Sequence, residues 1–347
     1  MKTVSIFFAL IALIIQSCSN AERKTDPSEI SYFEKNDTSV QTGGIKMIKI
    51  ETPKGNFNVW TKRIGNNPTI KVLLLHGGPG GTHESFECFD SFFPEAGIEY
   101  YYYDQLGSYY SDQPEDTSLW KLDRFVEEVE QVRKALDLSN SNFYLYGLSW
   151  GGILAMEYAL KYQNNLKALI ISNMMASCPE YGKYAEEVLS KQMDADILLE
   201  IRDLEARKDF SNPRYNELLF DHYYTKHICR LDEWPEPVTR LFKHLNYDIY
   251  VQMQGPSEFG IAGSLAEWDR KSDLVSIKVP TLTIGAKYDT MDPEHMKWIS
   301  SQVQLGKYLY CPNGSHLSMY DDQKIYFQGL IEFIKNVDQG TFKNDTP

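Results

Sequence analysis

A serine between glycines stands at the end of an apolar run in this chain. Gly147, Ser149 and Gly151 have the G-x-S-x-G spacing of a nucleophile elbow, and residues 143–146 before them read as a strand. In such an elbow the serine occupies a sharp strand-to-helix turn, and the glycines let the two backbones approach closely. A serine hydroxyl is a weak nucleophile unless a neighbouring base takes its proton. The spacing therefore predicts covalent catalysis by Ser149, assisted by a base and an acid from elsewhere in the chain.

The base predicted for Ser149 is His316, one of seven histidines. His316 follows a strand-like run at 307–310 and precedes the last predicted helix, so its loop lies at the carboxyl edge of a sheet. Three other histidines are predicted to pack or to lie on the surface: His222, His227 and His244. His76 belongs to a glycine-rich loop, and His83 follows that loop.

Two aspartates compete for the role of the acid that orients the base. Asp289 comes four residues after Gly285, which ends a predicted strand, whereas Asp292 precedes Pro293 as a good helix N-cap. We therefore assign Asp289 to the triad and Asp292 to capping. The resulting chain order of serine, aspartate and histidine is that of α/β-hydrolases, and not that of the chymotrypsin or subtilisin arrangements.

A glycine-rich segment, 76–81, follows the buried strand predicted at 72–75. Such a loop could cradle phosphate, but the spacings G-x-x-x-x-G-K-[ST] and G-x-G-x-x-G are absent from it. An oxyanion hole fits better, with one backbone N–H from Trp150, directly after the nucleophile, and another from Gly78.

Strand and helix signals alternate through most of the chain. Two alternating segments, 46–50 and 56–60, predict a hairpin. Further strands are predicted at 72–75, 98–103, 143–146, 168–171, 280–284 and 307–310, and helices near 119–136, 153–162 and 325–337. Strands alternating with helices in this way form mostly parallel sheets covered on both faces. We expect an α/β-hydrolase fold on a mostly parallel, doubly wound sheet.

The pattern changes after the strand at 168–171. Residues 176–273 contain no buried strand run and are rich in Glu, Lys, Tyr and Leu. We expect this segment to be a helical cap inserted over the active site. The catalytic domain is then built from residues 45–175 and 274–340.

The N-terminus reads as a targeting segment. Residues 1–17 combine an early lysine with an apolar stretch too short to cross a membrane, and they end before Cys18 in a lipobox-like sequence. We expect a lipoprotein signal peptide, lipid attachment at Cys18 and a flexible tether over 18–44, which gives an exported, membrane-anchored protein. A plain secretory signal with an incidental cysteine is the alternative.

Charge and cysteine content limit the partners. With 35 basic and 48 acidic residues the net charge is −13, which argues against nucleic acid and anionic lipid as ligands. The only membrane contact expected is the N-terminal lipid. No zinc spacing occurs, and no metal or organic cofactor is expected. We expect the other cysteines to be buried thiols and not disulfides, because nothing in the sequence specifies a pairing. They are Cys88, Cys178, Cys229 and Cys311.

Several motifs together resemble the proline iminopeptidase and tricorn-interacting aminopeptidase group of α/β-hydrolases. They extend from about residue 45 to the end of the chain. The matching segments are His76-Gly77-Gly78-Pro79-Gly80, Asp104-Gln105-x-Gly107-Ser108, Gly147-x-Ser149-Trp150-Gly151-Gly152, Gly255-Pro256-Ser257-Glu258-Phe259, Gly285-x-x-x-Asp289 and Gly314-Ser315-His316. The resemblance implies a serine exopeptidase that removes single residues, often proline, from short peptides with a free amine.

The same resemblance assigns Glu258 to the substrate ammonium. A carboxylate close to an amine favours its charged form. The chain departs from the group at three places, with Thr290 after the triad aspartate, Leu106 after Gln105, and tyrosines at 109–110. We therefore expect a broad or shifted aminopeptidase that accepts proline or small and hydrophobic N-terminal residues.

Two other functions compete with the aminopeptidase. The first is an esterase or amidase with the same triad and no need for an amine. The second is a surface lipoprotein that binds peptides without cleaving them, against which the intact triad argues. Nothing in the sequence specifies an oligomeric state.

Overall fold

The computed structural model describes residues 40–345 and consists of one eight-stranded sheet, flanking helices and a helical insertion. The strand order is β1-β2-β4-β3-β5-β6-β7-β8. The strands are β1 (Ile45–Thr52), β2 (Gly55–Ile64), β3 (Lys71–Leu75), β4 (Glu99–Asp104), β5 (Phe143–Leu148), β6 (Ala168–Ser172), β7 (Thr281–Ala286) and β8 (Gly306–Cys311). The predicted lipoprotein segment (1–17 and Cys18) and the tether up to residue 39 lie outside the described residues.

The sheet is parallel from β4 to β8 and antiparallel at its β1–β2 end. β1 pairs with β2 as the expected hairpin, with Ile48 opposite Val59, and β2 pairs antiparallel with β4. The other neighbouring strands pair in parallel. Strands β4, β5, β6 and β7 are buried along their whole length, as parallel strands covered on both faces must be. The expected mostly parallel, doubly wound sheet is confirmed.

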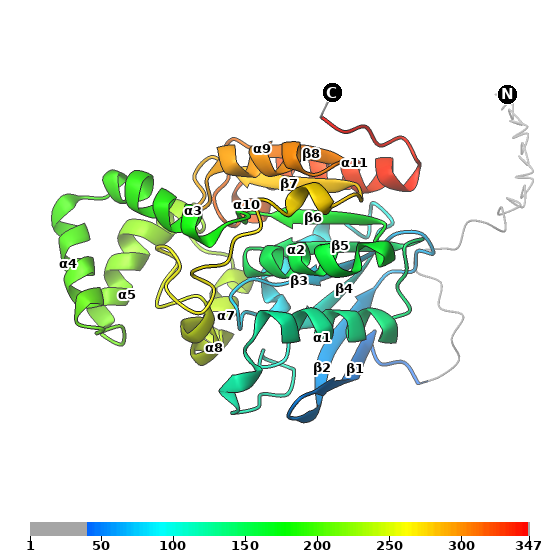
Figure 1. Ribbon diagram of the computed structural model, residues 1–347, viewed down its shortest axis with the longest axis horizontal. Helices are drawn as coiled ribbons and strands as arrows, with labels where there is room; N and C mark the ends of the chain where they lie inside the picture. The colour runs from blue at the N-terminus through cyan, green and yellow to red at the C-terminus, as the bar shows by residue number, and fades with distance from the viewer. Residues whose placement is uncertain (1–39, 346–347) are drawn as a thin grey trace, which may run out of the picture.

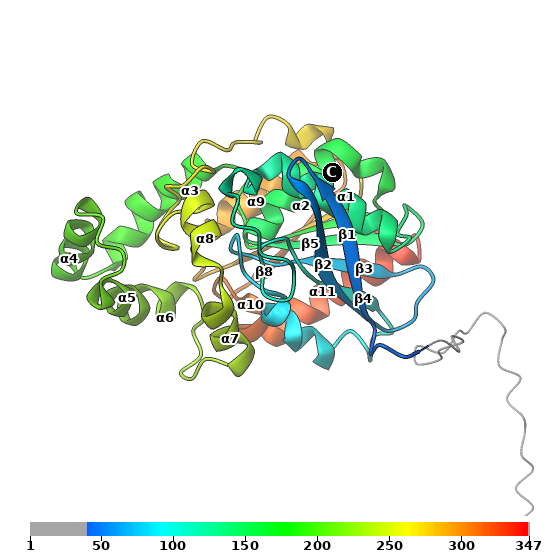
Figure 2. The same cartoon turned by 90° about the horizontal axis from the view of Figure 1, so that it is seen from below.

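Helices cover both faces of this sheet (Figures 1 and 2). α1 (Leu122–Ala135), α2 (Trp150–Tyr162) and α9 (Pro293–Gln302) lie on one face, and α10 (Ser318–Asp321) and α11 (Gln323–Asp338) on the other. Alternate residues of β3 show the division, because Leu73 joins the core on the first face and Leu74 the core on the second. The short 3-10 helix η1 (His83–Ser91) packs in the second core through Phe86 and Phe89.

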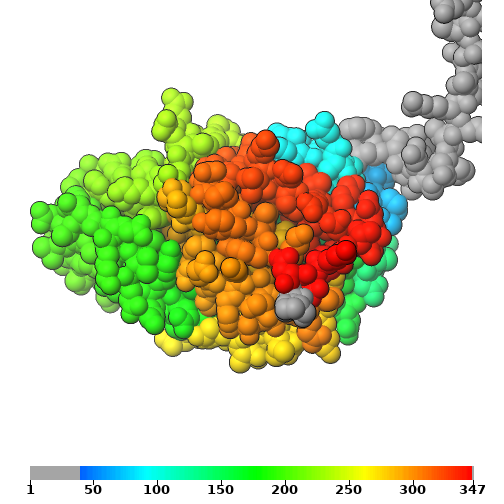
Figure 3. Space-filling view, turned by 90° about the horizontal axis from the view of Figure 1, so that it is seen from above, coloured from blue at the N-terminus to red at the C-terminus, as the bar shows by residue number. Residues whose placement is uncertain are grey.

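The chain between β6 and β7 forms a helical lobe at the carboxyl end of the parallel strands (Figures 1 and 3). Its helices are α3 (Cys178–Tyr184), α4 (Ala195–Ala206), α5 (Pro213–Leu219), α6 (Thr225–His227), α7 (Glu236–His244) and α8 (Tyr247–Met253). An isolated bridge joins Ser177 to Asp269, near the two ends of the lobe. α4 and α5 pack in a small core of their own. We call residues 176–273 the insertion.

Most element boundaries lie within a few residues of those expected from the sequence. The main difference is α2, which begins at Trp150 directly after the serine and not at residue 153. Within residues 40–345 no helix is both long and apolar enough to span a bilayer. The four cysteines of this region are unpaired; Cys178, Cys229 and Cys311 are buried and Cys88 is half-buried.

Candidate active site

Ser149 occupies a strained turn between β5 and α2. Its backbone has φ 55° and ψ −125°, a conformation that is costly for a residue with a Cβ. The turn is tight because a Cβ at position 147 would collide with the carbonyl of Gly151, and one at position 151 with that of Leu75. Glycine is therefore required at both flanks, as the motif predicts. The Ser149 N–H donates to the carbonyl of Ser172 on β6 at 3.0 Å, which fixes the turn to the neighbouring strand.

His316 and Asp289 form a buried pair in the loops after β8 and β7. Nδ1 of His316 lies 2.7 Å from Oδ1 of Asp289, and the two residues are 5% and 1% exposed. Burial alone would lower the pKa of His316, but the Asp289 carboxylate, together with those of Glu258 and Asp321, outweighs it, so the pKa is raised above its usual range. With Nδ1 facing the carboxylate, the proton is assigned there and Nε2 keeps a lone pair for use as a base.

Other groups hold the carboxylate of Asp289 in place. The side-chain amide of Asn173 donates to its Oδ2 at 2.7 Å, and the N–H of Met291 donates to Oδ1 at 3.1 Å. Asn173 follows β6 with a positive φ of 53°, so it too is a strained residue at the strand ends. The competing Asp292 accepts from the N–H of Glu294 and caps α9, as expected.

Ser149 and His316 face one cavity of about 300 Å³ between the sheet edge and the insertion. Both lie in the described part of the chain, and the structure gives no direct hydrogen bond between them. Hydrogen bonds between a nucleophile and its base are often loose in a free enzyme and tighten when substrate binds. The arrangement can therefore support acyl transfer once the hydroxyl turns toward the imidazole.

The glycine-rich loop borders the same cavity. Gly77, Gly78 and Gly81 line it, and a Cβ at position 77 would lie 3.2 Å from that of Ser149. Gly78 has φ 116°, which only glycine adopts readily. Among residues 40–345 no hydrogen-bond acceptor is found for the N–H groups of Gly78 and Trp150. Two free backbone donors beside a nucleophile can bind the oxygen of a tetrahedral intermediate.

Glu258 lies in the wall of the cavity that the insertion provides. Its side chain is half-buried, and the hydroxyl of Tyr250 donates to Oε1 at 2.7 Å. Its main-chain carbonyl accepts from the hydroxyls of Tyr181 at 2.5 Å and Tyr223 at 3.3 Å. Burial raises the pKa of the Glu258 carboxyl. A cation that enters the cavity would find this carboxylate as a partner.

The rest of the wall from the insertion is mainly apolar. The insertion's apolar and aromatic lining residues are Tyr224, Ile228, Leu241, Phe242, Leu245, Tyr247, Tyr250 and Pro256. Asn216 is its other polar contribution. Phe242 and Tyr247 are exposed as well as lining, so they stand at the cavity's rim. The composition suits a small apolar group held beside one charged group.

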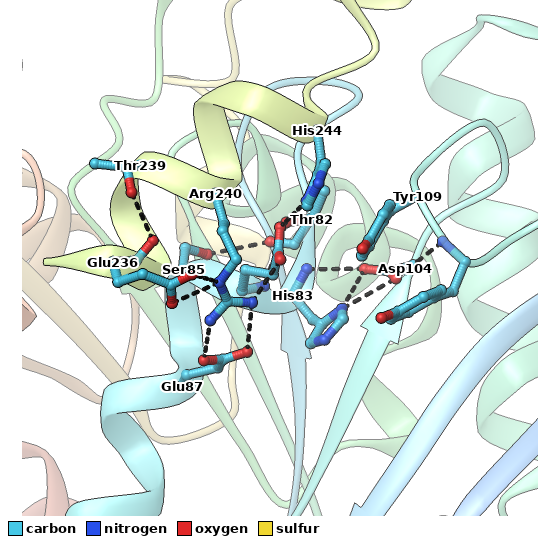
Figure 4. Close-up of polar contacts among 12 residues, drawn as sticks. Thr82, His83, Ser85, Glu87, Asp104, Tyr109, Glu236, Thr239, Arg240 and His244 are labelled. Carbon is cyan, nitrogen blue, oxygen red and sulfur yellow. Dashed lines mark hydrogen bonds and ion pairs between the residues drawn. The ribbon is translucent and has the colours of Figure 1, made fainter.

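A charged cluster fixes α7 to η1, next to the glycine-rich loop (Figure 4). Arg240 pairs with Glu84 at 2.6 Å and with Glu87 at 2.5 Å, and His244 Nδ1 lies 2.8 Å from Glu84 Oε2. Glu84 is 1% exposed and also accepts from the hydroxyl of Thr82 at 2.9 Å. Because α7 carries Leu241 and Phe242, the cluster sets the position of the apolar wall.

The loop of His316 is also tied to the insertion. The N–H of His316 donates to the carbonyl of His227 at 2.9 Å, and that of Leu317 to Ile228 at 2.8 Å. His227 is buried and holds this loop through its main chain, so of the packing and surface positions expected for it, the structure shows the buried one.

Sequence reasoning missed several of these contacts. The cluster of Glu84, Arg240 and His244 joins segments far apart in the chain, and no motif marks it. The support of Asp289 by Asn173 was missed for the same reason. A signal for Asn173 was nonetheless available, because it directly follows a buried strand at the edge where the site was expected.

The chain is similar to known proteins of the α/β-hydrolase fold. Residues 71–323 match the family model described as alpha/beta hydrolase fold. A proline iminopeptidase of Flavobacterium johnsoniae is 66% identical over 291 residues, which cover 84% of this chain and 98% of that protein. Among solved structures, VinJ matches with a TM-score of 0.78 at 25% identity, covering 84% of this chain and 99% of VinJ. A proline iminopeptidase of Mycobacterium smegmatis shares the fold with a TM-score of 0.75 at 24% identity, and the match covers 85% of this chain and 99% of that protein.

Proposed function

The chain belongs to the proline iminopeptidase family of α/β-hydrolases, and from this premise we propose how its residues release an N-terminal residue, proline above all, from short peptides. The observation that carries the proposal is that one cavity holds Ser149, His316 and Glu258. A nucleophile with its base can cleave an amide, and a carboxylate in the same small space can select a free amine. Within this account residues 45–175 and 274–340 form the catalytic domain, and 176–273 the cap.

Acylation begins at Ser149. Its Oγ attacks the carbonyl carbon of the N-terminal residue while Nε2 of His316 takes the hydroxyl proton. The carbonyl oxygen becomes negative and is bound by the N–H groups of Gly78 and Trp150, each of which contributes roughly 3–4 kcal/mol to transition-state binding. Asp289 holds the imidazole tautomer and stabilises the imidazolium.

The intermediate collapses when His316 gives its proton to the leaving nitrogen. The carbon–nitrogen bond breaks, the shortened peptide departs, and the N-terminal residue stays on Ser149 as an ester. Water then attacks this ester with His316 again as the base, and the free amino acid leaves with Ser149 restored.

Selection of the N-terminus rests on Glu258. The substrate ammonium pairs with this carboxylate inside the cavity, where an unpaired charge of either sign is costly. The ammonium lowers the pKa of Glu258 that burial had raised, so binding and ionisation reinforce each other. The apolar wall then accepts the side chain of the N-terminal residue, and the limited volume excludes residues on its amino side.

Paired fluorogenic substrates test the proposal. Prolyl, alanyl and leucyl amides of aminomethylcoumarin are compared with their N-acetylated copies. We expect cleavage of the free amines, fastest for proline, and rates at least about 100-fold lower on the blocked copies, because the blocked group cannot pair with Glu258. Equal rates on free and blocked substrates would instead indicate an esterase or amidase without an amine requirement.

We also propose that residues 1–17 direct export and that Cys18 is acylated, so that the tether 18–44 holds the enzyme at a membrane in the extracytoplasmic space. The support is the apolar core and lipobox-like sequence of this segment. Labelled palmitate should enter the full-length protein and not a Cys18→Ser variant. A wild-type protein that stays unlabelled and leaves the membrane fraction would contradict the proposal.

A further inference from the structure

Gln105 belongs to the segment Asp104-Gln105-x-Gly107-Ser108, to which the proposed mechanism gives no role. It directly follows β4 at the carboxyl edge of the sheet and is 1% exposed. Amide side chains are rarely buried without hydrogen-bond partners, because an unpaired amide is costly to bury. The partners of Gln105 therefore indicate what the residue does.

Both ends of the Gln105 carboxamide are engaged. Its Nε2 donates to the main-chain carbonyl of His76 at 3.3 Å, and its Oε1 accepts from the indole N–H of Trp150 at 2.8 Å. The donor and acceptor requirements of the two partners fix the orientation of the amide, since a carbonyl only accepts and an indole N–H only donates.

The main chain of Gln105 makes a third contact with the same loop. Its N–H donates to Nε2 of His76 at 3.1 Å, while Nδ1 of His76 lies 2.9 Å from the carbonyl of Gly77. Burial lowers the pKa of His76 to about 4, so the ring is neutral and can accept at Nε2. The tautomer that donates from Nδ1 satisfies both contacts.

These contacts join the two segments that carry the oxyanion donors. His76 precedes Gly78 by two residues, and Trp150 supplies the other N–H. The pairing of β3 with β5 already places Leu75 opposite Gly147. Gln105 comes from a third strand end and adds a side-chain bridge between His76 and Trp150 beyond that pairing. Displacing a catalytic group by about 1 Å costs roughly 100-fold in rate.

We propose that Gln105 is a positioning residue for the oxyanion hole: by bridging His76 and Trp150 it holds the N–H groups of Gly78 and Trp150 at the spacing that the transition-state oxygen requires. The inference rests on the proposed serine mechanism. It assigns Gln105 an effect on the transition state and not on the binding of substrate or product.

Gln105→Met tests this, because methionine has a similar length and neither hydrogen-bonding group. Three quantities are measured on the full-length protein: kcat on prolyl aminomethylcoumarin, inhibition by pyrrolidine-2-boronic acid, which forms a tetrahedral adduct with the serine, and inhibition by free proline. We expect kcat and boronic acid affinity to fall together by about 10- to 100-fold, with proline inhibition within about twofold of wild type. Unchanged boronic acid affinity, or equal losses for boronic acid and proline, would overturn the inference.

A double-mutant cycle that combines Gln105→Met with Trp150→Phe provides a second test, and Trp150→Phe alone serves if Gln105→Met folds poorly. Phenylalanine retains the backbone N–H at position 150 and removes only the indole donor to Gln105. The kcat of the double variant should be no lower than that of the worse single variant, whereas multiplying losses would contradict a shared bridge. Wild-type cleavage of prolyl amides and labelling by a fluorophosphonate, recorded alongside, show whether the serine mechanism itself stands.

Discussion

The sheet edge and the insertion hold their functional residues by different means. Ser149, Asp289 and His316 follow β5, β7 and β8, and main-chain contacts or strained backbone fix each of them. Glu258 instead depends on tyrosine hydroxyls, and the wall carried by α7 depends on ion pairs with η1. The two regions meet at the His316 loop, whose N–H donates to the carbonyl of His227 in the insertion. We expect the reaction chemistry to depend mainly on the sheet edge and substrate selection mainly on the insertion.

The largest effect is expected when the sheet edge is altered. Asp289→Asn should lower kcat by about 10⁴-fold and leave KM nearly unchanged, because the imidazole loses the acid that fixes its tautomer. Asp292→Asn makes the same chemical change three residues away and keeps a good helix cap, so it should retain wild-type kcat. Steady-state kinetics on prolyl amides compare the two; similar losses in both would remove Asp289 from its role.

A smaller and more selective effect is expected in the insertion. Glu258→Gln should lower kcat/KM for free-amine substrates by about 100-fold, because the ammonium loses its partner, and leave the low rate on N-acetylated copies unchanged. Glu267→Gln, an exposed position of the insertion, is the matched control. A uniform loss on free and blocked substrates would show that Glu258 serves the chemistry as well.

The pH dependence should separate the same two regions. His316 must be neutral to act as a base and its pKa is raised, so kcat should fall with acidification from a pH above the ordinary imidazole value of about 6.5. Glu258 must be ionised to bind the ammonium and its pKa is also raised, so KM should increase as the pH falls toward that pKa. The Glu258 carboxylate and the His316 imidazolium stabilise each other, so Glu258 helps to raise the pKa of His316. Glu258→Gln should therefore lower that pKa and move the acidic fall of kcat to lower pH.

Stopped or continuous assays at constant ionic strength measure how kcat and KM each depend on pH. An acidic fall of kcat that does not move in Glu258→Gln would contradict the electrostatic contact between the insertion and His316.

The smallest effect concerns the cluster on α7. Arg240→Ala leaves buried Glu84 with fewer partners and should lower the free energy of unfolding by about 1–2 kcal/mol. It should raise KM a few-fold through the displaced wall and leave kcat within about twofold. Arg207→Ala breaks an exposed pair with Asp203 and should change stability by less than about 0.5 kcal/mol. Denaturant unfolding and KM measurements compare the two variants. Equal effects of Arg240→Ala and Arg207→Ala would show that the cluster does not position the wall carried by α7.

The same division explains what the sequence predicted. Ser149, Asp289 and His316 could be predicted to lie near one another because each follows a strand in a local pattern, and parallel strands bring such loops to one edge of the sheet. The start of α2 was placed too late, at 153 and not at Trp150, because Gly151 and Gly152 are poor helix formers and only close packing against β3 makes helix favourable there.

Contacts between distant segments were beyond the sequence. Glu84 and Arg240 are 156 residues apart, and Asn173 and Asp289 are 116 apart. No local period or motif carries such pairs, since they depend on how whole elements pack. The sequence therefore predicted a helical cap, and it did not predict which side chains of the insertion line the cavity or contact η1.

The rate of covalent labelling by a small uncharged fluorophosphonate tests the division most directly, because this probe reacts with the serine without needing an amine site. Intact-protein mass spectrometry measures labelling of wild type, Glu258→Gln and Asp289→Asn. The account predicts that Glu258→Gln is labelled within about twofold of the wild-type rate while Asp289→Asn is slower by orders of magnitude. Equal slowing in both variants, or rapid labelling of Asp289→Asn, would contradict it.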